Sequence, residues 1–252
     1  MRMKKKGQAT MFIIFGIFLL VIVLLIFFLR AQLFSSQTAV SIDDQLVPLE
    51  DHIKTCISKV GEPLIQTIGK QGGYLTLIED TYSEYGATKI SYLCYNRKKD
   101  QRCYNRMLKK EEIEETLSKA IEQELPTCLN INQFKKGLQL TIGNKQVTTT
   151  IGEQTILVTL YLPITLKKNN LIVQKNNFTK TFNYPLGKLY DVSKEIIRAE
   201  TTTGSFDTQE YMTLHKGEIH IQKKQPYPDK LYILKTRQND YTFQFMIQGE
   251  PA

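Results

Sequence analysis

The sequence predicts an α+β protein in which one N-terminal transmembrane helix precedes an extracytoplasmic head of antiparallel β-sheet with about three packed helices. Three observations predict this class. Residues 11–29 form an unbroken apolar run, and apolar residues follow helical spacing in three later segments. From Leu138 onward apolar and polar residues alternate, as they do in half-buried strands. The predicted divisions are a cytoplasmic basic tag (1–10), the transmembrane helix (11–30), a stalk or linker (31–46) and the head (47–252).

The apolar run, MFIIFGIFLLVIVLLIFFL, is long enough to reach about 28 Å as a helix, close to the hydrocarbon thickness of a bilayer. Arg2, Lys4, Lys5 and Lys6 precede it, and no acid occurs in the first thirty residues. The positive-inside rule therefore predicts a plasma-membrane protein with a cytoplasmic N-terminus and an extracellular head, which contacts membrane lipid through residues 11–30. A cleaved secretory signal ending near Ala39 is the alternative, but the apolar region of such signals is usually about 7 to 15 residues long.

The positive charge of the chain gives little support to nucleic-acid binding. The sequence holds 33 Lys and Arg against 25 Asp and Glu, a formal net charge of +8. Four of the basic residues precede the apolar run, so they are explained by membrane topology. The remaining part is only about +4, and no nucleic-acid partner is expected.

Four cysteines, all after the apolar run, predict two disulfides, for which three pairings exist. We expect Cys56 to pair with Cys128, because each lies on or just after an apolar helical stripe and the two stripes can pack together. Cys94 and Cys103 flank a turn-like loop, and we expect them to pair locally. A zinc site is the alternative, but no C-x-x-C occurs and the three histidines are scattered. No metal or cofactor is therefore expected.

The predicted helices of the head follow from apolar spacing and from proline positions. The first begins near Leu49, with Pro48 in its first turn and a kink or break at Gly61 and Pro63. The second covers Glu111 to Leu125 and the third Leu186 to Glu200. Short apolar or alternating runs predict the strands, which are 74–78, 89–95, 138–142, 146–151, 155–166, 171–173, 178–182, 211–214, 218–222, 231–236 and 241–247.

Two surface features are candidate contact or modification sites. A basic loop between Cys94 and Cys103 could contact a polyanion, although a solvated hairpin tip is the ordinary interpretation of such a charge run. Its basic residues are Arg97, Lys98, Lys99 and Arg102. Asn177 begins the N-glycosylation sequon Asn177-Phe178-Thr179, which an outward-facing domain could use, although lone sequons are often vacant.

No catalytic motif is present in the sequence. There is no G-x-S-x-G, H-E-x-x-H, Walker or dinucleotide-binding glycine pattern. His52, His215 and His220 have no nucleophile placed beside them by the sequence, and acid pairs such as Glu111-Glu112 are explained by the start of a helix. The sequence therefore predicts that the protein is not an enzyme.

The segment Lys5-Lys6-Gly7-Gln8 running into the apolar stretch resembles the class III signal peptide of archaeal type IV pilins. The resemblance implies that a prepilin-type peptidase cuts after Gly7 and that Gln8 becomes the first residue. Phe12 departs from the family, in which the fifth mature residue is commonly a Glu that pairs with a neighbouring subunit. We therefore expect processing more readily than assembly into long filaments.

Other segments resemble uncharacterised archaeal single-pass surface proteins, a likeness that implies no known activity. They are the anchor, the Cys56 helix with Gln71 to Tyr74, Pro126 to Leu129, and Leu162 to Ile164. The sequence thus predicts a membrane-anchored structural protein of the cell surface that is pilin-like, with self-assembly or other envelope proteins as partners. The alternative is a membrane-tethered binding module that recognises a glycan, a peptide or a partner protein.

Overall fold

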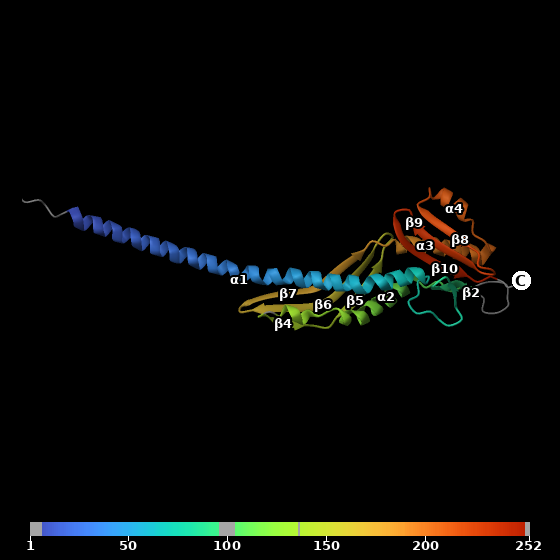
Figure 1. Ribbon diagram of the computed structural model, residues 1–252, viewed down its shortest axis with the longest axis horizontal. Helices are drawn as coiled ribbons and strands as arrows, with labels where there is room; N and C mark the ends of the chain where they lie inside the picture. Colours follow the sequence, from blue (N-terminus) through green and yellow to red (C-terminus); the bar gives the residue numbers. More distant parts are fainter. Residues whose placement is uncertain (1–6, 96–103, 136, 250–252) are drawn as a thin grey trace, which may run out of the picture.

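The computed structural model describes residues 7–95, 104–135 and 137–249, with the backbone alone for 7–14 and 27–45. The described residues form four α-helices, two short 3-10 helices and ten strands in two sheets, so the α+β part of the prediction is confirmed (Figure 1). The α-helices are α1 (Gly7–Lys70), α2 (Lys110–Glu124), α3 (Leu186–Thr203) and α4 (Thr208–Leu214), and the 3-10 helices are η1 (Leu125–Thr127) and η2 (Ile131–Phe134).

The predicted transmembrane helix and plasma-membrane localisation are wrong. In the part of the chain that the structure describes, no helix is both long and apolar enough to cross a membrane. The described side chains of the apolar stretch extend from Phe15 to Ile26.

The helix α1 is a single element of 64 residues rather than an apolar helix, a linker and a second helix. Pro48 and Pro63 both lie inside it, and the break predicted at Gly61 and Pro63 does not occur. Gly61 instead permits close packing, because a Cβ there would lie 2.9 Å from the Phe182 ring. Gly61 is therefore required by the packing of Phe182 on the helix and not by a kink in the helix.

The first sheet has the strand order β1-β2-β10-β9-β8, with β3 also paired to β2. Its neighbours are antiparallel except β2 and β10, which run parallel where Tyr92 faces Met246. The predicted head of antiparallel β-sheet is therefore two sheets, one of which is mixed. The strands are β1 (Tyr82–Tyr85), β2 (Thr88–Tyr95), β3 (Tyr104–Asn105), β8 (Ile219–Lys224), β9 (Lys230–Thr236) and β10 (Asn239–Ile247).

The second sheet is antiparallel throughout and is centred on β6. The strand β7 pairs with one edge of β6, and β4 and β5 pair with successive parts of the other edge. The bounds are β4 (Gln139–Ile142), β5 (Gln146–Ile151), β6 (Ile156–Lys168) and β7 (Leu171–Phe182). The prediction treated β7 as two short strands, but its pairing with β6 makes it continuous, apart from a register shift opposite Pro163.

The free edge of β5 is closed by the side chains of α2. Three α2 residues spaced four apart lie on one face of that helix and accept hydrogen bonds from alternate backbone N–H groups of the strand. The pairs are Glu114 Oε1 with Ile151 N at 2.7 Å, Ser118 Oγ with Thr149 N at 2.8 Å, and Glu122 Oε2 with Val147 N at 2.9 Å. An edge whose donors are satisfied in this way cannot template pairing with another chain.

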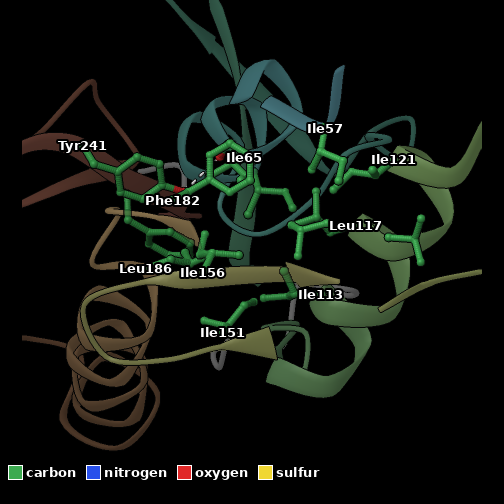
Figure 2. Packing of buried hydrophobic residues seen from close by; sticks show 14 of the residues in the cluster. Ile57, Ile65, Ile113, Leu117, Ile121, Ile151, Ile156, Phe182, Leu186 and Tyr241 are labelled. Atoms are coloured by element: carbon green, nitrogen blue, oxygen red, sulfur yellow. Dashed lines mark hydrogen bonds between the residues drawn. The ribbon is translucent and has the colours of Figure 1, made fainter. Parts of the chain in front are cut away.

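One hydrophobic core joins the second half of α1 to α2, α3 and both sheets (Figure 2). Figure 2 shows Ile57 and Ile65 of α1 beside Ile121 of α2 and Phe182 of β7. All four side chains are at most 5% exposed. Ile113, Leu117 and Ile121 are buried as the helical stripe of α2 predicts.

Two of the predicted strands are absent from the described residues. Residues 74–78 form bends and irregular backbone. Residues 211–214 belong to α4, because Asp207 caps that helix by accepting hydrogen bonds from Gln209 N and Glu210 N, each at 2.9 Å.

Candidate functional site

The free part of α1, which we define as Phe15 to Ile26, is the most unusual surface of the molecule. Figure 1 shows the N-terminal portion of α1 projecting away from the two sheets. The large apolar side chains of the free part are between 41% and 67% exposed, and the remaining residue, Gly16, has no atom within 4 Å of the position of a Cβ. Contiguous apolar surface of this extent usually marks an interaction site.

The free part is apolar on every side of the helix. Residues 15–26 read FGIFLLVIVLLI and contain no polar side chain, so the segment has no face suited to water. An amphipathic helix packs one stripe against one neighbour, whereas a uniformly apolar helix needs neighbours all around it. The surface therefore fits several partner helices better than a single groove.

The second half of α1 is held firmly by the head. Leu49, Ile53 and Ile57 recur at four-residue spacing and are each 0% exposed. Near the end of the helix, the Tyr241 hydroxyl donates to the Ile65 carbonyl at 2.9 Å, and Gln244 Nε2 donates to the Lys70 carbonyl at 3.0 Å. The head thus holds one half of the helix, whose free part is exposed.

A disulfide joins Cys56 of α1 to Cys128, which follows η1, as the sequence predicted. The two Cα atoms are 5.6 Å apart and Cys56 is 2% exposed. Cys94 is also disulfide-bonded. Its predicted partner, Cys103, lies outside the described residues, so the pairing of Cys94 with Cys103 stays a prediction.

The predicted anionic contact site falls outside the residues that the structure describes. Arg97, Lys98, Lys99 and Arg102 all lie outside the described residues. The neighbouring Arg106 lies over the rings of Tyr74 and Tyr95, with its Cζ 5.9 Å and 5.5 Å from the two centroids. Its guanidinium also donates to the carbonyls of Thr81 and Tyr92 at 3.5 Å, so Arg106 supports the fold.

The processing and glycosylation residues lie on regular elements. Gly7 and Gln8 are the first two residues of α1, and the structure describes only their backbone. Asn177 is exposed on β7, where it faces Tyr161 of β6 across the sheet.

A buried ionic cluster around Glu200 of α3 was missed at the sequence level. The Glu200 side chain is 1% exposed, and its Oε2 lies 2.6 Å from Lys230 Nζ while its Oε1 lies 3.7 Å from Lys223 Nζ. The Tyr232 hydroxyl also donates to Glu200 Oε1. Burial, and then this hydrogen bond, raise the pKa of Tyr232 far above its ordinary value. Since the carboxylate is enclosed and fully partnered, the cluster joins α3 to β8 and β9 rather than offering a reactive group.

The three histidines form no site together. The His52 ring lies 5.4 Å from the ring of Phe134, and His215 stacks on Tyr211 with centroids 4.0 Å apart. His220 is exposed on β8. Among the residues that the structure describes, no group of three or more His, Cys, Asp and Glu could hold a metal ion.

Two of the hollows on the described surface of the head are large enough to consider as binding sites. One, of about 360 Å³, is lined by Lys188, Lys216, Glu218 and Arg237 among others, and Lys188 Nζ lies 2.6 Å from Glu218 Oε2. The other, of about 380 Å³, is lined mainly by η2 and by the turn between β4 and β5. Within the described lining of either hollow there is no nucleophile hydrogen-bonded to a base, which acyl or phosphoryl transfer would use.

Comparisons of this chain with family models, with curated proteins and with solved structures find no significant match. Function is therefore inferred from the surfaces of the chain itself.

Proposed function

We propose that this protein is a pilin-like structural subunit that associates with copies of itself through the free part of α1. The observation that carries the proposal is an apolar helical segment, exposed on all sides, that extends from a head fixed to the other half of the same helix. Identical helices packed side by side would remove this surface from water. Each buried CH₂ group contributes about 0.8 kcal/mol, so several residues per subunit are enough for stable association.

A second copy of the helix is a better occupant than a pocket on another protein. The free part has no polar face, so a bundle of like segments covers it, whereas a groove covers one stripe. The continuous helix also joins this segment directly to the part of α1 that packs in the head. Repeated identical contacts between rigid subunits generate closed or extended assemblies.

The resemblance at the N-terminus supports the same proposal. Cleavage after Gly7 would make Gln8 the first residue of a subunit whose apolar helix begins at once. Because Phe12 stands where pilins commonly have an acid, association depends on apolar packing alone. We therefore expect limited multimers rather than long filaments.

Sedimentation velocity of the full chain tests association. The wild-type protein should sediment as a multimer at micromolar concentration. The variant Phe18→Lys/Ile22→Lys, which places two charges on one face of the free part, should sediment as a monomer, because burying unpaired charges costs several kcal/mol. Leu214→Lys is the matched control, since Leu214 is 71% exposed on α4 of the head.

Two results would overturn the proposal of self-association. One is a wild-type monomer, including a single chain held in a lipid or detergent particle. The other is a Phe18→Lys/Ile22→Lys variant that still assembles like the Leu214→Lys control. Circular dichroism of the head should be the same in all three proteins, which separates lost association from lost folding.

Processing is tested separately by intact mass in a strain that contains a prepilin-type peptidase. The wild-type chain should begin at Gln8, and Gly7→Leu should leave a longer chain, because the peptidase needs a small residue before the cut. Equal masses for the two proteins would show that the Lys-Lys-Gly segment is only a basic flank.

A further inference from the structure

The outward face of the second sheet, independent of the proposed association through α1, is unusual in its lack of charge. We define the outer face as the fifteen paired residues of β4, β5, β6 and β7 whose side chains point away from α1 and α2. The inner residues of β6, such as Leu160 and Ile164, are 0% and 1% exposed, whereas alternate residues are exposed or half-buried. Within these described strands, Lys167 is the one charged residue of the outer face.

Threonine hydroxyls form a regular array on this face. Seven of the fifteen residues are threonines, and Thr148, Thr159 and Thr179 lie side by side across β5, β6 and β7. Neighbouring strands are about 4.8 Å apart and alternate residues of a strand about 6.8 Å apart, so the hydroxyls repeat in two directions. Within the described part of the chain these side chains donate no hydrogen bond to another residue, which leaves their donors and acceptors available to a ligand.

An aromatic ring lies within the array. Tyr161 of β6 is 45% exposed and is paired with Gln146 of β5 on one side and Asn177 of β7 on the other. A half-exposed ring offers an apolar surface, and the amides beside it offer both donors and acceptors. The face thus combines a stacking platform with many neutral polar groups.

We propose that the outer face binds a neutral polysaccharide, with Tyr161 stacking on one sugar ring and the threonine and amide groups bonding to hydroxyls on either side. An uncharged ligand suits a face that has almost no charge. The repeated hydroxyls of a polysaccharide can hydrogen-bond to the repeated threonine hydroxyls of the face. A second copy of the sheet is a poorer occupant. Packing two such faces together without water would bury many threonine and amide groups without hydrogen-bond partners, and each such group would cost free energy.

Binding is tested with the full-length chain, immobilised for interferometry after production in a host that does not N-glycosylate, so that Asn177 carries no glycan. The soluble probes are dextran, mannan and hydroxyethylcellulose, with dextran sulfate as the anionic comparison. At least one neutral polymer should bind the wild-type chain. Tyr161→Ala should weaken that binding roughly tenfold, since an aromatic contact contributes up to about 1.5 kcal/mol.

Two further variants separate a specific site from general adhesion. Thr159→Val keeps the shape of the side chain but removes a central hydroxyl, and it should weaken binding less than Tyr161→Ala does. Tyr227→Ala is the matched control, because Tyr227 is 76% exposed but lies between β8 and β9, away from the outer face, and it should leave binding unchanged. The proposal is overturned if no neutral polymer binds, if dextran sulfate alone binds, or if Tyr161→Ala and Tyr227→Ala behave alike.

Discussion

Removing the disulfide between Cys56 and Cys128 should cost the head a large part of its stability. The bridge closes a segment with a sequence separation of 72 residues. In the chain-entropy model a loop of that length lowers the entropy of the unfolded chain enough to contribute about 4 kcal/mol at 25 °C. Domains of this kind are stable by only about 5 to 15 kcal/mol, so the variant Cys56→Ala/Cys128→Ala should lie close to the limit of folding.

Urea unfolding without reductant, followed by circular dichroism, measures the change. The midpoint should fall, and the slope of the unfolding free energy against urea should rise somewhat, because the unfolded chain without the bridge is more expanded. Part of any loss comes from the cavity at Cys56, which is 2% exposed, so Cys56→Val/Cys128→Ala serves as the filled-cavity control. A loss below about 1 kcal/mol in both variants would refute the chain-entropy account of this bridge.

Four further substitutions test particular contacts of the fold. Gly69→Ala should destabilise by about 2 kcal/mol or more in urea unfolding, because its Cβ would lie 2.4 Å from the Thr242 carbonyl oxygen; full stability would contradict the close approach. Ser118→Ala should cost about 1 to 3 kcal/mol of stability, because it leaves the Thr149 N–H unpaired. Thr149→Val removes a buried hydroxyl that has no partner, so it should be neutral or stabilising. If calorimetry shows the larger loss for Thr149→Val, the contact between α2 and β5 is contradicted. Burial, and then the hydrogen bond to a carboxylate, raise the pKa of Tyr92 to about 12. The contribution of Tyr92 to the free energy of unfolding is therefore complete below pH 10 and is lost between pH 10 and about 12. Tyr92→Phe should remove about 2 to 3 kcal/mol from the loss of stability at alkaline pH. An unchanged profile of the unfolding free energy against pH would contradict this prediction.

Local patterns in the sequence predicted most of the helices and strands. The stripe of α2 and the alternation in β10 correspond to buried residues, because both elements turn one face to a single core. The disulfide between Cys56 and Cys128 followed from the same stripes. These features depend on residues close in sequence or on packing that apolar periodicity indicates.

The errors arose where distant residues decide the structure. Proline and glycine at 61–63 suggested a break in α1, but packing against Phe182 keeps the helix continuous and makes the glycine necessary. The parallel pairing of β2 with β10 joins segments about 150 residues apart, so no local pattern could reveal it. Asp207 was a recognisable helix cap, and reading it would have predicted α4 in place of a strand.

The two surfaces proposed to bind partners, the free part of α1 and the outer face of the second sheet, could be predicted only in part from the sequence. The apolar stretch predicted an interaction of the N-terminal helix, but with a membrane, which the described structure contradicts. The Glu200 cluster could not be found from the sequence, since Lys223, Lys230 and Tyr232 come from other elements. The threonine-rich outer face required the register of four strands, which alternation alone does not fix.

Cross-linking between subunits tests the central claim, association through the free part of α1, most directly. Ile22→Cys places a thiol in the middle of that segment, and Leu214→Cys places one on the exposed head as the control. Under mild oxidation the Ile22→Cys chain should form covalent dimers on a non-reducing gel, at a yield that rises with protein concentration, and the control should stay monomeric. A monomeric Ile22→Cys chain, or equal dimer yields from the two variants, would contradict the account.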